Sequence, residues 1–481
     1  MNSIKSEFVP TMAEMMAWTT EIFNQGIRRP GYPADYWVEN WVKNHFETMG
    51  LQNIALDPII IKKWETSEPK LKIWLIDNPE DVFEIPCFPI PYTTPTNGLE
   101  AELSIISDEA SLSGKIGVHN LNLFTFPVRI LKSFSGVDGY YDPINEFETL
   151  EQMVPFDYKM RVIMDPAFTN KAVGFIGILS GYPWETEKYY VPYDAVKRDF
   201  PGVYVSGNKG KILLKLMEKG TVRAKMSYEA NISEINSHNV IGTLPGMSDE
   251  WIVIGSHHDG PWNSAVEDAS GIALVLAQAQ YWSQIPKEDR PFNLMFLLNC
   301  AHMAGGKGTI TFVEKNKELL KKVIVGIHLE HVARDVKSEN GTLIPLDDPT
   351  VRWWFISRIL PLEKIVHDAI IKEDLKRSIL LPPDGFPPGS DRIPTDGYFY
   401  HPENVPFISL LAAPPYLIDP ADTLDKIHQE SFEPLTRAVI RIINALKNYS
   451  ASKLRSLILN KKERHKLWKK NIKNINLKNK Y

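Results

Sequence analysis

The chain has 481 residues, of which 43% are hydrophobic and 23% charged, and its only two cysteines are Cys87 and Cys300. These fractions are average for folded globular proteins and exclude a wholly disordered or fibrous chain. Two cysteines also exclude a disulfide framework and a four-thiolate zinc site. No run of eighteen apolar residues occurs, so we predict no membrane span and a cytoplasmic location.

Residues 1–68 are predicted to form two helices followed by a strand. The second helix runs toward Gly50, a residue type that often ends a helix as a C-terminal cap. Residues 69–230 have a different sequence pattern, because short β-rich runs alternate there with Pro, Gly and Asp turns. We therefore expect residues 69–230 to be a mostly β insertion.

Residues 231–450 alternate between short, continuously apolar strands and helices. This pattern is typical of a parallel sheet that helices cover on both faces. The predicted fold class is therefore α/β, with a mostly parallel mixed sheet flanked by helices. Residues 1–68 are expected to be the N-terminal part of the same domain.

The tail, residues 451–481, is strongly basic. From Ser452 onward it holds eleven Lys or Arg residues against the single Glu463, while Leu454, Leu457 and Trp468 recur at nearly helical spacing. We predict a basic amphipathic helix packed on an acidic body, rather than an arm that binds nucleic acid. An oligomer remains compatible with this sequence.

Histidines and carboxylates cluster after three of the predicted strands. Ligands of open α/β sheets bind at the carboxyl ends of the strands, and mixed His and carboxylate groups have the composition of a metal site. In an extended backbone His257 and Asp259 share one face, so Asp259 could orient a metal-bound His257, and His258 would face elsewhere. His328 and Glu330 likewise share a side that His331 does not. The residues after these strands are His257, His258, Asp259, His302, His328, Glu330 and His331.

Motifs of other hydrolases are missing. The sequence contains no Gly-x-Ser-x-Gly elbow, no phosphate-binding Gly-x-x-x-x-Gly-Lys-Ser/Thr loop and no His-Glu-x-x-His helix. Cys300 ends an apolar strand, so we interpret it as a small buried hydrophobe rather than a nucleophile.

A family resemblance becomes specific at these motifs. The order GSHHDGPW, SAVEDASGIALVLAQA, AHMAGGKGTITFV, GIHLEHV and DPADTLDKI resembles the zinc aminopeptidase family. That family includes glutamate carboxypeptidases, glutaminyl cyclases and the non-catalytic transferrin receptors. GVYVSGNKGKILLKLMEKG followed by SHNVIGTLPG is similar to the end of an inserted protease-associated domain, so the resemblance implies such a domain within residues 69–230.

The resemblance implies a reduced ligand set. His257 matches the first metal ligand, Glu267 stands at the bridging position and Glu330 fits the later acidic ligand. The family's Glu-Glu pair falls on His302 and Met303, and its final histidine falls on Ile418. This implies one divalent ion, with zinc as the first choice, held by His257, Glu267 and Glu330. Asp259 would assist catalysis, and His302 would act as the general base or as an extra ligand.

Substrate contacts are expected from the long Pro- and Gly-rich loop and the segment that closes the fold. Arg392 could clamp a carboxylate or form a structural salt bridge. The candidate substrate-binding residues are Arg392, Tyr398, Tyr400, His401 and Tyr416.

The leading hypothesis is a metal-dependent hydrolase that cleaves the C–N bond of a small peptide or another amide. A first alternative is a non-catalytic binding or scaffold protein on the same fold, which Met303 and Ile418 favour. A second alternative is acyl transfer as in glutaminyl cyclases, although those enzymes keep the half-site that is lost here.

Overall fold

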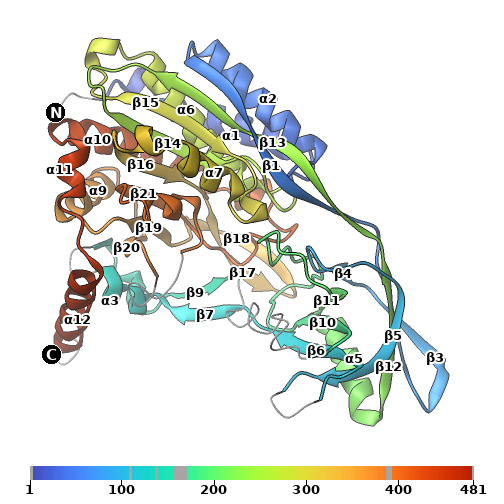
Figure 1. Cartoon of the computed structure of the whole chain (residues 1–481). Helices are drawn as coiled ribbons and strands as arrows, with labels where there is room; N and C mark the ends of the chain where they lie inside the picture. The colour runs from blue at the N-terminus through green and yellow to red at the C-terminus, as the bar shows by residue number, and fades with distance from the viewer. Residues whose placement is uncertain (1–3, 108–110, 136–138, 156–170, 386–392, 479–481) are drawn as a thin grey trace.

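The computed structural model describes residues 4–107, 111–135, 139–155, 171–385 and 393–478. Two large sheets organise these residues, one of nine strands and one of eight. The nine-stranded sheet and its helices form the larger body, and the eight-stranded sheet lies beside it at the lower right of Figure 1.

The nine-stranded sheet is mixed, with parallel pairs at its centre and between β19 and β20, and antiparallel pairs elsewhere. Parallel pairing joins β15 to β14, β14 to β16, and β16 to β21. This mixed α/β sheet confirms the predicted fold class. Its strands in spatial order are β1 (Gln52–Thr66), β13 (Ala230–Leu244), β15 (Asn293–Asn299), β14 (Trp251–His257), β16 (Val323–Leu329), β21 (Phe407–Leu411), β19 (Arg352–Ile356), β20 (Ser378–Leu381) and β8 (Tyr140–Tyr141).

Both faces of this sheet are buried, as its unbroken apolar strands require. Ile252 and Ile254 of β14 pack in one core, and Val253 between them packs in the other. Helix α7 (Lys307–Lys315) contributes to the second core. The helices that contribute to the first core are α1 (Met12–Phe23), α2 (Pro33–Thr48), α6 (Gly271–Ser283), α9 (Leu360–Lys372) and α10 (Phe432–Ala445).

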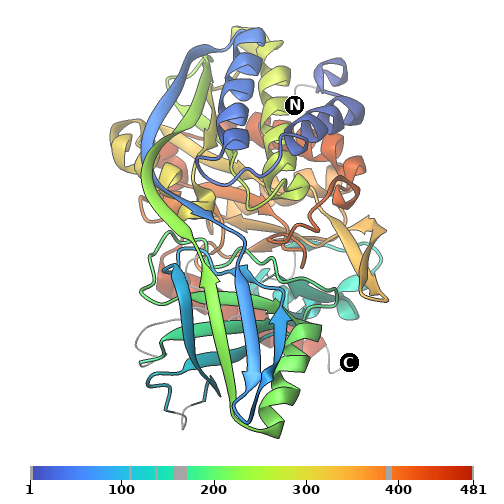
Figure 2. The same cartoon turned by 90° about the vertical axis from the view of Figure 1, so that its right-hand side faces the viewer.

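The eight-stranded sheet is built from the predicted insertion. Helix α5 (Gly207–Lys219) packs on it through Leu213 and Leu216, in a hydrophobic core of its own. Strands β1 and β13 pair from Gln52 to Thr66 and reach from one sheet to the other (Figure 2). The strands in spatial order are β3 (Asn78–Ile85), β2 (Lys70–Leu75), β12 (Val222–Tyr228), β5 (Thr96–Ile105), β6 (Ile116–Leu121), β10 (Gly174–Leu179), β11 (Gly202–Ser206) and β4 (Phe88–Pro89).

Residues 69–230 also contribute to the larger body. Strand β8 pairs with β20 at the edge of the nine-stranded sheet, and Phe147 and Val154 share a core with Trp353. Two further two-stranded antiparallel sheets pair β7 (Phe124–Pro127) with β9 (Glu151–Val154) and β17 (Arg334–Glu339) with β18 (Thr342–Pro349). The segment between β1 and β13 therefore supplies strands to both sheets.

The basic tail forms α11 (Ala451–Arg455) and α12 (Lys461–Lys478). The Trp468 ring stacks on Phe134 of α3 (Lys132–Ser135), with 6.0 Å between the ring centroids, and Arg464 pairs with Asp384. This face of α12 lies against the body, while lysines such as Lys466 and Lys470 are exposed. Over the described residues, no helix combines the length and the apolar character that crossing a membrane requires.

Candidate metal centre

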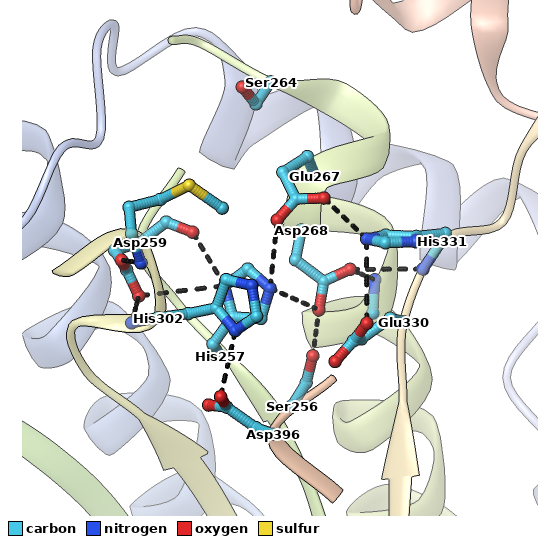
Figure 3. A network of polar contacts seen from close by, with 12 residues as sticks. Ser256, His257, Asp259, Ser264, Glu267, Asp268, His302, Glu330, His331 and Asp396 are labelled. Atoms are coloured by element: carbon cyan, nitrogen blue, oxygen red, sulfur yellow. Dashed lines mark hydrogen bonds and ion pairs between the residues drawn. The ribbon is translucent and has the colours of Figure 1, made fainter. Parts of the chain in front are cut away.

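Three loops at the carboxyl edge of the parallel strands bring the predicted residues together (Figure 3). His257 ends β14, His302 begins the short turn after β15, and Glu330 and His331 follow β16. Glu267 lies just before α6 and completes the cluster. All five are buried, so the cluster is shielded from bulk water and its charged groups depend on one another.

Glu267 lies between two histidines. Its Oε1 is 3.2 Å from His257 Nε2, and its Oε2 is 2.6 Å from His331 Nε2. The loop before α6 is fixed by Asp422, whose carboxylate accepts hydrogen bonds from the backbone N–H groups of Val266 at 2.8 Å and Glu267 at 2.9 Å. The possible ligand atoms of His257, Glu267 and His302 all lie within 4.8 Å of one another.

The three site histidines share one hydrogen-bonding pattern. Nδ1 of His257 lies 3.0 Å from the Asp259 carbonyl oxygen, Nδ1 of His302 lies 3.0 Å from Asp396 Oδ1, and Nδ1 of His331 lies 2.5 Å from the Ala412 carbonyl oxygen. The oxygens beside His257 and His302 accept, so Nδ1 of each of these two rings carries a proton. Nδ1 of His331 lies 3.3 Å from the Ala412 backbone N–H as well, so these contacts do not fix its tautomer. Nε2 of His257 and of His331 is buried and makes no hydrogen bond of good geometry, and each faces the Glu267 carboxylate as an ion pair.

This donor set fits a divalent metal ion. Histidines that bind metals usually donate their other ring N–H to an oxygen, which fixes the ring and its tautomer. Unpartnered buried nitrogens are otherwise costly, and two imidazoles with a carboxylate are ligands that zinc accepts. The rings of His257 and His302 are stacked with centroids 4.1 Å apart and an interplanar angle of 11°. Their Nε2 lone pairs lie in these nearly parallel planes, so one ring has to turn before both nitrogens can bind the same ion.

Glu330 and Asp259 lie at the site, but their carboxylates have other partners. Glu330 Oε1 is 2.8 Å from His328 Nε2 and accepts from the Thr395 hydroxyl at 3.0 Å. The Asp259 carboxylate accepts from the backbone N–H groups of His302 at 3.0 Å and Met303 at 2.7 Å. Asp259 therefore orients His257 through its carbonyl, and its carboxylate fixes the turn that carries His302.

The prediction that His331 faces away from the site is wrong. Its φ of 57° is left-handed, so the alternation of β16 ends there and the ring turns toward Glu267. Asp396 was missed because it lies 94 positions from its partner His302. Thr309 Oγ1 donates to the other Asp396 oxygen at 2.7 Å.

His258 faces elsewhere, as predicted, in a second buried cluster with Asp35 and Glu39 of α2. His258 Nδ1 is 2.7 Å from Asp35 Oδ1, and Nε2 is 2.9 Å from the His238 carbonyl oxygen. Glu39 accepts from the Ser237 hydroxyl and from the His238 backbone N–H. Ligand-type atoms of these three residues also lie within 4.8 Å, but both nitrogens of His258 are already bonded.

Neighbouring charges shift the pKa values of the site groups. Burial alone would raise the pKa of Glu267, but His331 and His257 hold it well below its usual range. Burial and His257 lower the pKa of His302, yet Asp396 outweighs them and raises it overall. Asp396 has a lowered pKa, because His302 stabilises its charge against the effect of burial. The site is thus a set of paired charges.

Arg28 holds the loop between His257 and Glu267. Its guanidinium is fully buried and donates to the backbone carbonyls of His258 at 3.3 Å, Ser264 at 2.8 Å and Glu267 at 3.2 Å, and also to that of Asn263. A charged residue in the sequence GIRRPG gives no sign of burial, so sequence reasoning did not find this role.

A hollow of about 20 Å³ adjoins the cluster. Its ionisable lining at the cluster consists of Glu267, His302 and His331, Tyr193 adds a ring with a hydroxyl group, and the other lining side chains are apolar, among them Met303, Leu411 and Ile418. This volume suits a water or an ion, because a water needs at least about 10–15 Å³.

The predicted substrate residues do not line this hollow where the structure describes them. Tyr416 is fully buried and donates its hydroxyl to the Arg334 carbonyl at 2.8 Å. Tyr400 is packed in the second core, and the His401 ring lies 6.2 Å from those of Tyr398 and Phe407. These aromatic residues support the loop through packing. Arg392 lies outside the described residues.

Comparison with known proteins points to one family. The model of peptidase family M28 matches residues 239–443, and no curated protein matches the chain significantly. An aminopeptidase from Aneurinibacillus sp. strain AM-1 is 18% identical, with 93% of this chain and 96% of that chain covered and a TM-score of 0.62. A peptidase M28 precursor from Shewanella amazonensis is 18% identical, with coverage of 93% and 95% and a TM-score of 0.68. A zinc aminopeptidase from Bacillus subtilis is 13% identical, with coverage of 94% and 99% and a TM-score of 0.60.

Proposed function

We propose that this chain, which belongs to an aminopeptidase-like metallopeptidase family, is a hydrolase that uses one zinc-type ion to cleave an amide C–N bond. The observation that supports this proposal best is the shared pattern of His257, His302 and His331. Nδ1 of His257 and of His302 donates to an oxygen, Nδ1 of His331 contacts the Ala412 backbone, and Nε2 of His257 and of His331 faces Glu267. In a site that had lost its activity, we would not expect this arrangement of histidines around Glu267.

We assign His257, Glu267 and His302 as the metal ligands, because their ligand atoms form the compact group. His302 is then the extra ligand rather than the base, and Asp396 orients it. Glu330, which the family resemblance implied as a ligand, supports the site through His328 and Thr395. Three protein ligands with one open position are typical of catalytic zinc.

The bound ion would supply Lewis acidity that polarises a carbonyl and makes water more acidic. His331 is the proton acceptor in this proposal. Its Nδ1 contacts the Ala412 backbone, and its Nε2 lies 2.6 Å from Glu267, which outweighs burial and raises the pKa of His331 to about 9. With Glu267 engaged by an ion, Nε2 would be open to take a proton from a water in the hollow and later return it to the leaving amine. The apolar neighbours Met303 and Ile418 exclude bulk water from this point.

Elemental analysis and amide hydrolysis of three purified variants test this assignment. We expect one metal ion per wild-type chain, loss of the ion in His302→Ala, and retention of the ion with loss of hydrolysis in His331→Gln. His465→Gln, in the exposed tail helix, is the matched control and should resemble the wild type.

Absence of metal from the wild type together with absence of hydrolysis would favour the scaffold alternative. Product masses separate the remaining pair, because hydrolysis adds one water to the products and acyl transfer without water does not. If His302→Ala keeps the ion but loses hydrolysis, His302 is the general base and not a metal ligand.

A further inference from the structure

Two adjacent arginines hold the segment that joins the ligands His257 and Glu267, residues 258–266, which we call the metal loop. Arg28 donates to two of its backbone carbonyls, at 3.3 and 2.8 Å. Arg29 is also buried, with 4% of its surface exposed, and its Nε donates to the Pro261 carbonyl at 2.9 Å. A second guanidinium therefore holds the metal loop near its midpoint.

Aromatic rings surround the Arg29 guanidinium in an arrangement that we call the aromatic cage. A guanidinium within about 6 Å of a ring centre is attracted by the electrons of the ring face, most strongly where water is excluded. The rings, with the distance from the guanidinium carbon to each centroid, belong to Trp262 (4.4 Å), Tyr190 (4.9 Å), Trp64 (5.5 Å), Phe88 (5.5 Å) and Tyr32 (5.7 Å).

The aromatic cage draws its rings from both parts of the molecule. Phe88 belongs to β4, an edge strand of the eight-stranded sheet, and Trp64 belongs to β1, which reaches from one sheet to the other (Figure 2). Trp262 belongs to the metal loop, and its ring lies 5.2 Å from that of Phe88. The insertion and the metal loop thus meet at Arg29.

The aromatic cage is also bonded to the wall of the hollow. Trp262 Nε1 donates to the Ile418 carbonyl at 3.1 Å, and the Tyr190 backbone N–H donates to the same oxygen at 3.3 Å. The side chain of Ile418 lines the hollow beside the metal ligands. A displacement of either cage residue would therefore reach both the metal loop and the hollow.

We infer that Arg29 is a positioning residue for the metal site, and that the aromatic cage makes the metal loop depend on the insertion. The inference rests on the proposed function for the ion and adds how the insertion acts on its ligands. Without the guanidinium, the Pro261 carbonyl loses a donor and the rings lose the cation between them. The metal loop then opens more often, and His257 and Glu267 are held less firmly for the ion.

Hydrogen exchange in the metal-free full chain tests the dependence without any ion. Amides of the metal loop are bonded in the fold, as His258 N–H is to the Asn299 carbonyl at 3.0 Å, so their exchange reports opening of the loop. We expect exchange in residues 258–266 to be about tenfold faster in Arg29→Met and about threefold faster in Phe88→Leu. The amides of β16 should exchange as in the wild type.

Matched variants separate this effect from a general loss of stability. Phe83→Leu makes the same change on β3, at the opposite edge of the eight-stranded sheet, and should leave exchange in the metal loop unchanged. Arg29→Lys keeps a cation without the planar group and should lie between wild type and Arg29→Met. If Arg29→Met does not fold, Arg29→Lys and Phe88→Leu decide. Wild-type exchange in Phe88→Leu, or an equal increase in Phe83→Leu, would overturn the inference.

Zinc affinity, measured by competition with a chelator, distinguishes positioning of the ligands from a purely structural role. Arg29→Met should bind zinc about tenfold more weakly than the wild type, and adding Phe88→Leu to it should weaken binding little further, because both changes break one unit. Faster loop exchange with unchanged zinc affinity would make Arg29 structural only and overturn the inference. If the wild type binds no zinc, the proposed function fails, and the exchange result alone decides whether the metal loop depends on the insertion.

Discussion

Two buried clusters in this chain contain the same kinds of side chain and differ in one respect. His257, Glu267 and His302 form one, and Asp35, Glu39 and His258 form the other, with His257 and His258 adjacent in sequence. In the first cluster His257 Nε2 has no hydrogen-bond partner and a hollow adjoins the group. In the second, both nitrogens of His258 and the carboxylate of Glu39 are bonded.

The difference shows that proximity of His and carboxylate groups is not enough to indicate a metal site. A bonded cluster has already satisfied its donors and acceptors, so a metal ion would have to displace good hydrogen bonds. In an incompletely bonded cluster the buried polar atoms lower the stability of the fold until an ion binds them. We therefore interpret the second cluster as a structural link between α2 and the loop that carries the first.

The largest expected effect separates the adjacent histidines. His257→Gln should lose the bound metal ion completely, because it removes a ligand. His258→Gln should keep one ion per folded chain, as measured by elemental analysis after gel filtration. The reverse outcome, with metal lost only in His258→Gln, would move the metal site to the second cluster.

A smaller but still large effect is expected on stability. Asp35→Asn removes the nearest counter-ion of the protonated His258 in a fully buried position, and the free energy of unfolding should fall by about 3–5 kcal/mol. Asp57→Asn is the control, because Asp57 pairs with the exposed Lys315 and should cost less than about 1 kcal/mol. Denaturant titration measures both, and equal losses would contradict a stabilising role of the buried pair.

The smallest effect concerns pH. Burial lowers the pKa of His258, but Asp35 and Glu39 outweigh it and raise the pKa from 6.5 to about 9. Because the folded pKa exceeds the unfolded one, the stabilisation is complete below pH 6.5 and is lost as the pH rises toward 9. Zinc-saturated wild type should lose about 2 kcal/mol more over this interval than His258→Gln. Parallel pH profiles of the two proteins would show that His258 is not charged in the fold.

The site could be predicted from the sequence because its residues directly follow strands that are recognisable as apolar runs. Each parallel strand is a continuous apolar run, and the residues after β14, β15 and β16 meet at one edge whatever the details of the loops. It failed where a single backbone angle or a distant contact decides the outcome. The left-handed φ of His331 reverses its direction, and Arg28 and Asp396 reach the site from remote parts of the chain.

The aromatic residues of the long loop and of the segment that closes the fold were predicted to contact substrate, but the structure places them differently. Tyr400 and Tyr416 have the composition of a binding loop, but their rings are buried in the core. Amphipathic rings suit either role, because an apolar body and one polar tip can be satisfied by a substrate or by a backbone carbonyl. Only the packing of the surrounding strands distinguishes the two.

The pairing of β1 with β13 has a consequence for the modularity of the chain. Thr66 lies opposite Ala230, so the intervening segment leaves and re-enters the larger body at neighbouring positions, and a tight turn would span the gap if that segment were excised. Excision would nevertheless remove β8 from the sheet edge and Phe147 and Val154 from the core around Trp353. The insertion could therefore be removed at this junction without breaking the path of the chain. Its removal would still expose the sheet edge and the part of the core that it covers, so it is not an independent domain.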